Sequence, residues 1–319
     1  MKYGVSTHPG RKRRHNEDAY VIEPPLFAVA DGMGGAKAGE VASGLAAAAL
    51  KEGGGDGPDA ETRVTELIQE ANRRVFRRAT EDREAAGMGT TMTVALVDGE
   101  RVVFGHVGDS RAYLIRDGAI EQLTDDHSLV AELVRSGRLT PDEAETHPQR
   151  SVITRAVGTE ADVDVDTFSI EPSPGDLFLI CSDGLTDMVD DRTIFQAIEK
   201  HRGNLEEAAK ALVVAANRSG GEDNITVVFF EVSENGEEAG DTAVTQQAPA
   251  VGTETAEDED TLSGLEGVPT VDDTMVVPPE DVAGLPDARP RRRRAMPIIA
   301  ALAVLLIIAA AVLWLLEHL

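Results

Sequence analysis

The chain has 319 residues, and its 57 acidic and 30 basic side chains give a formal net charge of −27. This acidic balance argues against nucleic acid as a partner, because a phosphate backbone requires clustered lysine and arginine. The single cysteine, Cys181, excludes a framework of disulfide bonds and is typical of a reducing compartment.

Composition divides the chain into four segments. Residues 1–232 mix apolar and polar stretches in the manner of one compact domain. Residues 233–290 are dominated by Glu, Asp, Thr, Ala, Gly and Pro and hold too few large apolar side chains to offset the entropy of ordering, which predicts a disordered acidic linker. Residues 291–297 form a basic segment, and residues 298–316 form an apolar run without any charge.

The apolar run predicts a membrane-spanning helix. At roughly 1.5 Å rise per residue, its length would be about 28 Å, close to the thickness of a hydrocarbon core. The arginines of residues 291–297 flank its N-terminal end and are expected to stay in the cytoplasm. We therefore expect a single-pass protein of the cell membrane whose residues 1–232 lie in the cytoplasm.

In chain order, the patterns within the first segment predict groups of strands separated by helices. An apolar stretch at 19–30 predicts a strand that leads into Asp31, and helical spacing follows at 40–51 and from Pro58 to about residue 84. Later strands are expected at 90–97, 101–107, 111–115, 119–123, 163–170, 176–180 and 225–232, with helices at 192–201 and 205–217. Asp-Gly pairs between the runs signal hairpins, so the grouping favours a layered α+β sandwich over a parallel sheet.

The stretch 125–158 differs from the rest of the domain. It is polar, contains Pro141 and Pro148, and holds one short helical pattern at 129–136. Long connections of this kind often form lids or contact the substrate, which is one interpretation of the stretch. The other interpretation is a surface loop without a functional role.

Five acidic clusters are spread over the domain, and most carry a glycine beside the carboxylate. An aspartate at the end of a buried strand, with a glycine that allows close approach of the backbone, suits an oxygen-lined site for hard divalent cations. The clusters therefore predict a multi-metal hydrolytic site assembled from distant parts of one fold. They are Asn16-Glu17-Asp18, Asp31-Gly32-Met33-Gly34-Gly35, Gly108-Asp109-Ser110-Arg111, Ser182-Asp183-Gly184 and Gly221-Glu222-Asp223-Asn224.

Together with further short motifs, these clusters resemble the PP2C (PPM) family of metal-dependent protein serine/threonine phosphatases, in its bacterial form. The resemblance covers nearly all of residues 1–232 and implies a four-layer α-β-β-α sandwich, in which two antiparallel sheets are flanked by helices. The further motifs, in the order of the family, include Arg13-x-x-Asn16-Glu17-Asp18, Gly89-Thr90-Thr91, Asp126-His127-Ser128, Thr154-Arg155-Ala156-Val157-Gly158 and Asp223-Asn224-Ile225-Thr226.

The resemblance also implies a ligand set for two cations, Mn²⁺ or Mg²⁺. Asp31 would bridge the ions, the Gly32 carbonyl would complete the shell of the second ion, and Asp183 and Asp223 would hold the first. Glu17 and Asp18 would bind the second ion or orient its waters. Asp109 and Asp187, with Asp183, would hold a third ion of conditional occupancy. The alternatives are a hairpin turn at Asp109 and a carboxylate in the first turn of a short helix at Asp187.

Two further roles follow from the resemblance. Arg13 has the planar fork that grips two phosphate oxygens, and Asn224 is expected to orient Asp223 by hydrogen bonding. A water that bridges two such ions would be the nucleophile for in-line attack at phosphorus.

The general acid has no assignment in the sequence. Some family members carry a histidine where this chain has Met33, and His15 and His106 are interpreted as structural. A thiol-phosphatase reading of Cys181 is disfavoured, because Asp187 stands where that class needs an arginine to close the phosphate loop.

The expected function is the hydrolysis of phosphoserine and phosphothreonine on proteins, in opposition to a Hanks-type serine/threonine kinase. Thr255 and Thr270 each precede an aspartate by three residues and, once phosphorylated, would resemble ligands of forkhead-associated domains. The alternatives are a pseudophosphatase that acts as a phosphoprotein-binding scaffold at the membrane, or a phosphatase of another phosphoester or of a sigma-factor regulator.

Overall fold

The computed structural model of the chain describes residues 1–34, 38–53, 57–232 and 275–276. None of the helices within these residues is both long enough and apolar enough to cross a membrane. The predicted membrane helix at 298–316 and the basic segment before it lie outside the described residues. Thr255, Thr270 and most of the predicted linker lie outside them as well.

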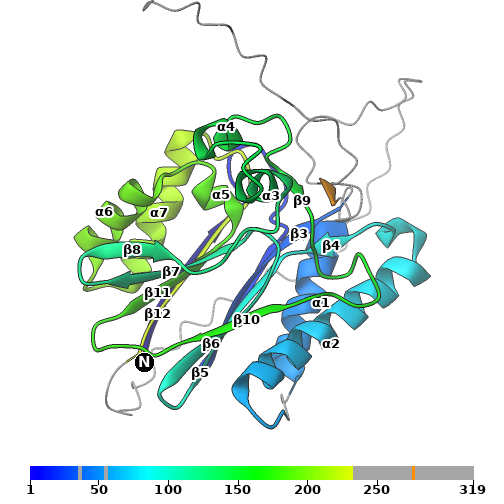
Figure 1. Ribbon diagram of the computed structural model, residues 1–319, viewed down its shortest axis with the longest axis horizontal. Helices are drawn as coiled ribbons and strands as arrows, with labels where there is room; N and C mark the ends of the chain where they lie inside the picture. The colour runs from blue at the N-terminus through cyan, green and yellow to red at the C-terminus, as the bar shows by residue number, and fades with distance from the viewer. Residues whose placement is uncertain (35–37, 54–56, 233–274, 277–319) are drawn as a thin grey trace, which may run out of the picture.

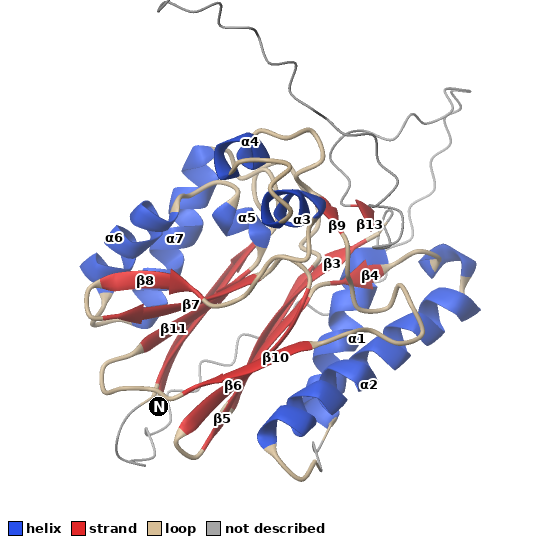
Figure 2. Ribbon diagram, in the orientation of Figure 1, coloured by secondary structure: helices blue, strands red, loops and turns tan. Residues whose placement is uncertain are grey.

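Two antiparallel sheets lie face to face at the centre of the molecule (Figures 1 and 2). The first has the order β1-β12-β11-β7-β8, with bounds β1 (Lys2–His8), β12 (Ile225–Glu231), β11 (Leu177–Cys181), β7 (Arg111–Arg116) and β8 (Ala119–Gln122). The second has the order β10-β6-β5-β3-β2, with bounds β10 (Asp166–Ile170), β6 (Arg101–Val107), β5 (Met92–Asp98), β3 (Leu26–Met33) and β2 (Asp18–Glu23), and short β4 (Gly89–Thr90) pairs with the end of β3.

Helices cover the outer face of each sheet. The helices α1 (Ala38–Glu52) and α2 (Ala60–Glu81) pack on the second sheet, whereas α6 (Asp191–His201) and α7 (Leu205–Ser219) pack on the first (Figure 1). The short helices η1 (Arg83–Ala85) and α5 (Asp183–Thr186) follow α2 and β11. The predicted α+β fold of two antiparallel sheets with flanking helices is confirmed.

The central strands of both sheets, β3, β5 and β6 in one and β7, β11 and β12 in the other, are buried on both faces, because every second side chain points to the helices and the others point to the opposite sheet. Phe229 of β12 packs in the cluster beneath α6 and α7, whereas its neighbour Phe230 packs between the sheets. There the ring of Phe230 stacks on Phe27 of the second sheet, with centroids 4.4 Å apart, and on Phe178, with centroids 5.0 Å apart. The contact between Phe27 and Phe230 joins the two sheets, whereas Phe178 lies beside Phe230 in the same sheet.

Two elements differ from the sequence-based expectation. The stretch 19–30 is not one strand but the hairpin β2–β3, because Pro24 and Pro25 cannot continue a ladder of backbone hydrogen bonds. Strand β1 was not predicted; it pairs with β12 along its whole length at the edge of the first sheet. The alternation of buried and exposed residues along β1 is weak, since only Gly4 is fully buried.

Residues 125–158, named the flap from here on, leave the sandwich at the ends of the strands (Figure 1). They contain α3 (Leu129–Arg135), α4 (Pro141–Glu145) and β9 (Val152–Ile153). Thr140 and Glu143 form a reciprocal capping box at the start of α4, which gives this short helix a defined beginning. The strand β13 (Met275–Val276), in a segment for which the sequence predicts no ordered element, pairs in parallel with β9.

Candidate active site

The predicted acids meet at one end of the sandwich because each stands at the corresponding end of a strand. Asp18 begins β2 and lies directly opposite Asp31 on β3. In the other sheet, Asp183 follows β11, and Asp223 precedes β12, which pairs with β11. Asp109 comes directly after β6 and Gly108, whose φ of 109° is a backbone conformation that favours glycine.

Asp18 links the two sheets. Its Oδ2 accepts hydrogen bonds from Ser182 Oγ at 2.9 Å and from Thr226 Oγ1 at 2.6 Å, both of which belong to the opposite sheet or its strand ends. Its Oδ1 is buried and has no hydrogen-bond partner. Burial raises the pKa of Asp18 to about 6 in spite of the two hydroxyl donors.

The backbone around Asp31 is held by the Gly89-Thr90-Thr91 motif. Asp31 N–H donates to Thr91 Oγ1 at 3.0 Å, and the Asp31 carbonyl accepts from Thr90 Oγ1 at 2.8 Å. Burial, followed by repulsion from Asp18 and Asp183, raises the pKa of Asp31 well above its usual range. Only glycine fits at position 32, because a Cβ there would lie 2.1 Å from the carbonyl oxygen of Gly39.

Asp109, Asp183 and Asp187 form a second group of carboxyls beside the first, of which Asp109 is buried, Asp183 is partly buried and Asp187 has a side chain that is 37% exposed. Burial raises the pKa of Asp183, and repulsion from Asp109 and Asp187 adds to the effect. Burial also raises the pKa of Asp109 to about 7. Asp187 caps the C-terminal end of α5, where its N–H donates to the Asp183 carbonyl at 2.8 Å, so the alternative interpretation of Asp187 as a carboxylate in the first turn of a short helix is wrong.

Asn224 connects the N-terminal loop to β12. Its Oδ1 accepts from the Glu17 N–H at 2.6 Å, and its Nδ2 donates to the carbonyls of Pro9 and His15 at 3.0 and 2.9 Å. The side chain therefore positions Glu17, whereas Asp223 is held by the Asn224 backbone N–H at 2.8 Å. The expected side-chain contact from Asn224 to Asp223 is absent among the hydrogen bonds of the described residues. Burial raises the pKa of Glu17.

Arg13 lies at the edge of this cluster. Its guanidinium Nη2 is 2.9 Å from Asp223 Oδ2, and about one third of each side chain is exposed to solvent. The structure therefore brings the only predicted phosphate-binding residue to the same end of the sandwich as the acids. An exposed guanidinium beside buried carboxyls can contact an anion that approaches them from solvent.

The carboxyl cluster has the oxygen donors and the unsatisfied oxygen atoms that suit divalent cations. Asp18 Oδ1 and Asp183 Oδ1 are buried without a hydrogen-bond partner, which costs free energy unless another group satisfies them. Burial and mutual repulsion raise the pKa of each buried carboxyl, and hard cations would reverse this effect. No three His, Cys, Asp or Glu side chains of the described residues are already gathered in a geometry that would hold an ion, so the fit rests on the donor set and its unsatisfied oxygens.

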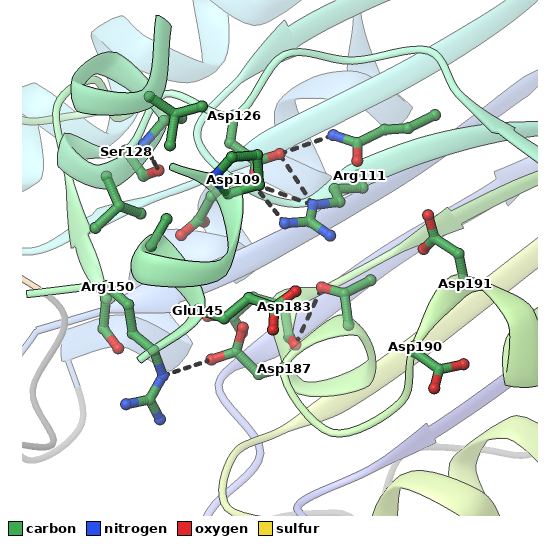
Figure 3. Close-up of a pocket in the computed structure, with 18 of the residues that line it drawn as sticks. Asp109, Arg111, Asp126, Ser128, Glu145, Arg150, Asp183, Asp187, Asp190 and Asp191 are labelled. Carbon is green, nitrogen blue, oxygen red and sulfur yellow. Dashed lines mark hydrogen bonds and ion pairs between the residues drawn. The ribbon is translucent and has the colours of Figure 1, made fainter. Parts of the chain in front are cut away.

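A groove of about 1190 Å³ opens beside the acids, between α5 and the flap (Figure 3). Asp109, Asp183 and Asp187 lie at its base, and α3 and α4 contribute to its wall. Arg150 of the flap reaches towards Asp187, with Nε 3.7 Å from Oδ2. Arg150 was not predicted as a site residue; the only signal was its place within the polar stretch 125–158.

The base of the flap is fixed by buried polar contacts. Arg111 and Asp126 form a bidentate ion pair with a shortest distance of 2.7 Å (Figure 3). His106 is buried, with its ring nitrogens 2.9 Å from Thr93 Oγ1 and 3.1 Å from the Asp125 carbonyl. Burial lowers the pKa of His106 to about 3, so the imidazole stays neutral and the structural interpretation of His106 is confirmed.

The burial and contacts of three other residues considered for the chemistry show what each of them does. Cys181 is fully buried and its pKa is raised to about 12, so the thiol stays protonated and the thiol-phosphatase alternative fails. Met33 packs against Ile153 and Ala156, which makes it a contact between the end of β3, the strand that carries Asp31, and the flap. His15 is exposed, and its backbone carbonyl is the group that contacts Asn224.

Two packed sheets with flanking helices, and with buried acids and an arginine at one end, define the class of metal-dependent phosphatases. Residues 11–216 match the family model for protein phosphatase 2C. The serine/threonine phosphatase stp of Listeria monocytogenes is 42% identical over 236 residues, which cover 70% of this chain and 93% of that protein. The chain belongs to the protein phosphatase 2C family.

Solved structures agree with this assignment. The crystal structure of the Mycobacterium tuberculosis serine/threonine phosphatase PstP/Ppp superimposes with a TM-score of 0.69 at 40% identity, covering 73% of this chain and 99% of that one. The catalytic domain of PstP in complex with two manganese ions gives a TM-score of 0.66 at 39% identity, covering 72% and 96% of the two chains.

Proposed function

We propose that this site hydrolyses phosphoserine and phosphothreonine on proteins with the help of two divalent cations, Mn²⁺ or Mg²⁺. The chain is a protein serine/threonine phosphatase by family, as the names of its relatives state. The observation that carries the proposal is the pair of buried carboxyl oxygens, Asp18 Oδ1 and Asp183 Oδ1, that no protein group satisfies. The crystal structure of a relative with two manganese ions supports a divalent metal.

In this proposal Asp31, Asp183 and Asp223 hold the ions, and the Gly32 carbonyl contributes an oxygen ligand. Glu17 and Asp18 complete the set, while Asp109 and Asp187 serve a third ion. Bound cations would lower the pKa of a coordinated water and neutralise charge on the phosphate. All these carboxyls lie at one end of the sandwich, which disfavours a pseudophosphatase that has lost its ligands.

The residues of the chain itself would orient the phosphate group, hold the carboxyls in place and accommodate the substrate polypeptide. Arg13 presents a partly exposed guanidinium beside Asp223, where it can donate two hydrogen bonds to phosphate oxygens. Asn224 holds Glu17 in place, and the Ser182 and Thr226 hydroxyls hold Asp18. The groove beside Asp109, Asp183 and Asp187 can accommodate the polypeptide around a phosphorylated residue.

Purified protein with Mn²⁺ is expected to release phosphate from a phosphothreonine peptide. Asp183→Asn should lower kcat/KM about 100-fold or more, because it removes a charged ligand from the cation site. Asp191→Asn is the matched control, since Asp191 lines the same groove at the start of α6, away from the buried carboxyls. Activity that survives Asp183→Asn, or that does not need a divalent metal, would refute the proposal. Faster turnover of a small phosphoester than of the phosphopeptide would favour another substrate class.

We further propose that the apolar run at 298–316 anchors the enzyme in the cell membrane, with the catalytic domain in the cytoplasm. The support is the length of the run and the basic segment before it. Tethering would concentrate the enzyme near a membrane-bound serine/threonine kinase that it opposes. Recovery of the full chain in the soluble fraction after cell lysis would contradict the anchor.

Phosphorylated Thr255 or Thr270 would be a ligand for a forkhead-associated domain in this proposal. The support is the aspartate three residues after each threonine. Mass spectrometry of the protein from cells tests the idea directly, and a chain without phosphate on either threonine would remove it.

A further inference from the structure

Strand β13 lies against the flap although it comes from a segment well beyond the catalytic domain. It pairs in parallel with β9, so that Met275 is opposite Val152 and Val276 is opposite Ile153 (Figure 2). The pairing joins the segment predicted to be a disordered linker to the flap beside the groove. This contact is independent of the acids and of Arg13.

The edge of β9 that receives β13 is left open by the flap itself. Within the flap, Val152 N–H donates to the Gln149 carbonyl at 3.2 Å and Thr154 N–H donates to the His127 carbonyl at 2.8 Å. Successive backbone N–H groups of a strand point to opposite sides. The N–H of Ile153 therefore points away from these partners, to the edge along which β13 lies. An open strand edge of this kind is a template for another strand.

The sequence of the segment suits a single short strand. Met275-Val276-Val277 is the only run of three large apolar residues within residues 233–290, and β-branched residues favour the extended conformation. Pro278 and Pro279 follow immediately and cannot donate backbone hydrogen bonds to a ladder. The segment therefore encodes one strand of limited length within an otherwise polar stretch.

Strand β9 lies between the end of β3 and the flap helix α3. Ile153 packs with Met33, the residue after the Asp31-Gly32 pair, whereas Val152 packs with Leu129 at the start of α3. Residues of α3 line the groove. A strand added to the edge of β9 can therefore influence the position of the groove wall.

We propose that Met275 and Val276 act as an intramolecular strand ligand of the flap. The strand extends β9 and holds the flap against Met33 at the end of β3, so that α3 is placed over the groove for a protein substrate. The docking itself does not depend on the proposed function; its effect on substrate recognition does.

Hydrogen exchange of the full-length chain in a mild detergent tests the docking. The variant Met275→Asp/Val276→Asp should speed the exchange of amides in residues 149–156 about threefold or more, because it removes the apolar strand and adds charge. The variant Val244→Asp/Val251→Asp is the matched control, since it adds the same charge elsewhere in residues 233–290. Equal exchange in the two variants and the unmodified chain would overturn the proposal. Protection that falls on tenfold dilution would assign the strand to a second copy and overturn the intramolecular form.

Steady-state kinetics test the consequence for the groove. The Met275→Asp/Val276→Asp variant should raise KM for a phosphothreonine peptide about threefold and leave the turnover of p-nitrophenyl phosphate unchanged, because the small ester does not need the groove wall. Unchanged KM together with faster exchange would overturn the link between docking and recognition. An unmodified chain without phosphatase activity would refute the proposed function alone, since the exchange experiment needs no turnover.

Discussion

Asp18 and Asp31 are direct partners across the antiparallel strands β2 and β3. Like charges at directly opposed positions destabilise a sheet, and burial makes the repulsion stronger. The pKa of Asp18 is raised to about 6 and that of Asp31 is raised well above its usual range, in both cases chiefly by burial. The fold therefore holds a pair of carboxyls whose joint ionisation is unfavourable, and bound cations would offset this cost.

Removal of one of these charges should stabilise the metal-free protein and abolish activity. We expect Asp31→Asn to raise the free energy of unfolding by about 1 to 2 kcal/mol in EDTA at pH 7.5, because the repulsion with Asp18 and Asp183 disappears. Urea unfolding with and without Mn²⁺ measures this change, and Mn²⁺ should stabilise the variant less than the natural chain.

The control for this variant is Asp98→Asn, which alters a half-exposed carboxylate 3.5 Å from Arg63. It should change the free energy of unfolding by no more than about 0.5 kcal/mol. A metal-free Asp31→Asn protein that is less stable than the natural chain would contradict the repulsion argument.

The metal-free protein should lose stability as the pH rises from 5 to 7. The pKa values of Asp18 and Asp109 are raised to about 6 and about 7, from ordinary values near 4 in the unfolded chain, so the folded state binds more protons in this range. These two carboxyls alone should lower the free energy of unfolding in EDTA by about 2 to 4 kcal/mol between pH 5 and pH 7. Asp31 and Asp183, whose pKa is also raised, should add to the fall.

Urea unfolding across this pH range, repeated with saturating Mn²⁺, measures the effect. Carboxylates whose pKa is lowered, such as Glu70 and Glu222, lose their contribution only at lower pH. Burial lowers the pKa of His106 and His127, so these histidines add stability as the pH rises through this range and offset part of the fall, with and without Mn²⁺ alike. With Mn²⁺ the fall should vanish or reverse, because cations bind the ionised carboxyls. A metal-free pH profile parallel to the profile with Mn²⁺ would show that these carboxyls are ionised in the folded protein without cations.

Most of the site could be predicted from local sequence because its acids stand at strand ends. Asp31-Gly32 and Ser182-Asp183-Gly184 each follow an apolar run, and the antiparallel order of the strands brings such ends together. The glycine at position 32 was also informative, since a Cβ there would clash with Gly39. Such local patterns can be read from the sequence alone, because an apolar run indicates a buried strand and a glycine indicates close approach of two backbone segments.

Contacts between segments far apart in sequence could not be predicted in the same way. The hydroxyls of Ser182 and Thr226 reach Asp18 only because the two sheets pack face to face at one spacing. Arg150 approaches Asp187 because of the way the flap folds back over the groove, and no hydrophobic periodicity in the sequence predicts this course. Strand β1 depends on its partner β12 for its hydrogen bonds and has little alternation of its own.

Loss of the Asn224 side chain should weaken both the fold and metal binding. Asn224→Ala removes three buried hydrogen bonds that hold the Pro9, His15 and Glu17 backbone, so we expect a loss of about 2 to 3 kcal/mol in stability and a reduced affinity for Mn²⁺. Calorimetric titration with Mn²⁺, below the unfolding temperature, separates the two effects.

Asn72→Ala is the matched control. Asn72 is also fully buried and makes three hydrogen bonds, from Nδ2 to the Glu160 and Ala161 carbonyls and from the Gly158 N–H to Oδ1, away from the acids. It should lose similar stability and keep its Mn²⁺ affinity. Equal affinity in both variants would mean that Asn224 has no part in the placement of Glu17.

Replacement of the only cysteine should leave catalysis intact. Cys181 is fully buried in the cluster beneath α6 and α7, and its thiol has a pKa of about 12, so it is not available as a nucleophile. Cys181→Ala should cost about 1 to 2 kcal/mol of stability through the lost packing and retain kcat on a phosphothreonine peptide. A loss of kcat without a loss of stability would restore the thiol mechanism.

Arg13 should contribute mainly to phosphate binding and to the transition state. Arg13→Ala removes the guanidinium beside Asp223, and we expect kcat/KM for a phosphothreonine peptide to fall by about 10- to 100-fold, because a charge-assisted hydrogen-bond pair to phosphate is worth about 1.5 to 3 kcal/mol. Arg13→Lys should recover part of the loss, since lysine keeps the charge without the planar fork.

Lys12→Ala is the control for Arg13→Ala. Lys12 pairs with Glu222 at the surface, 2.5 Å away, and its loss should change kcat/KM less than about twofold. If Lys12→Ala and Arg13→Ala lower kcat/KM equally, the effect comes from the general positive charge of the loop and not from a specific contact between Arg13 and phosphate.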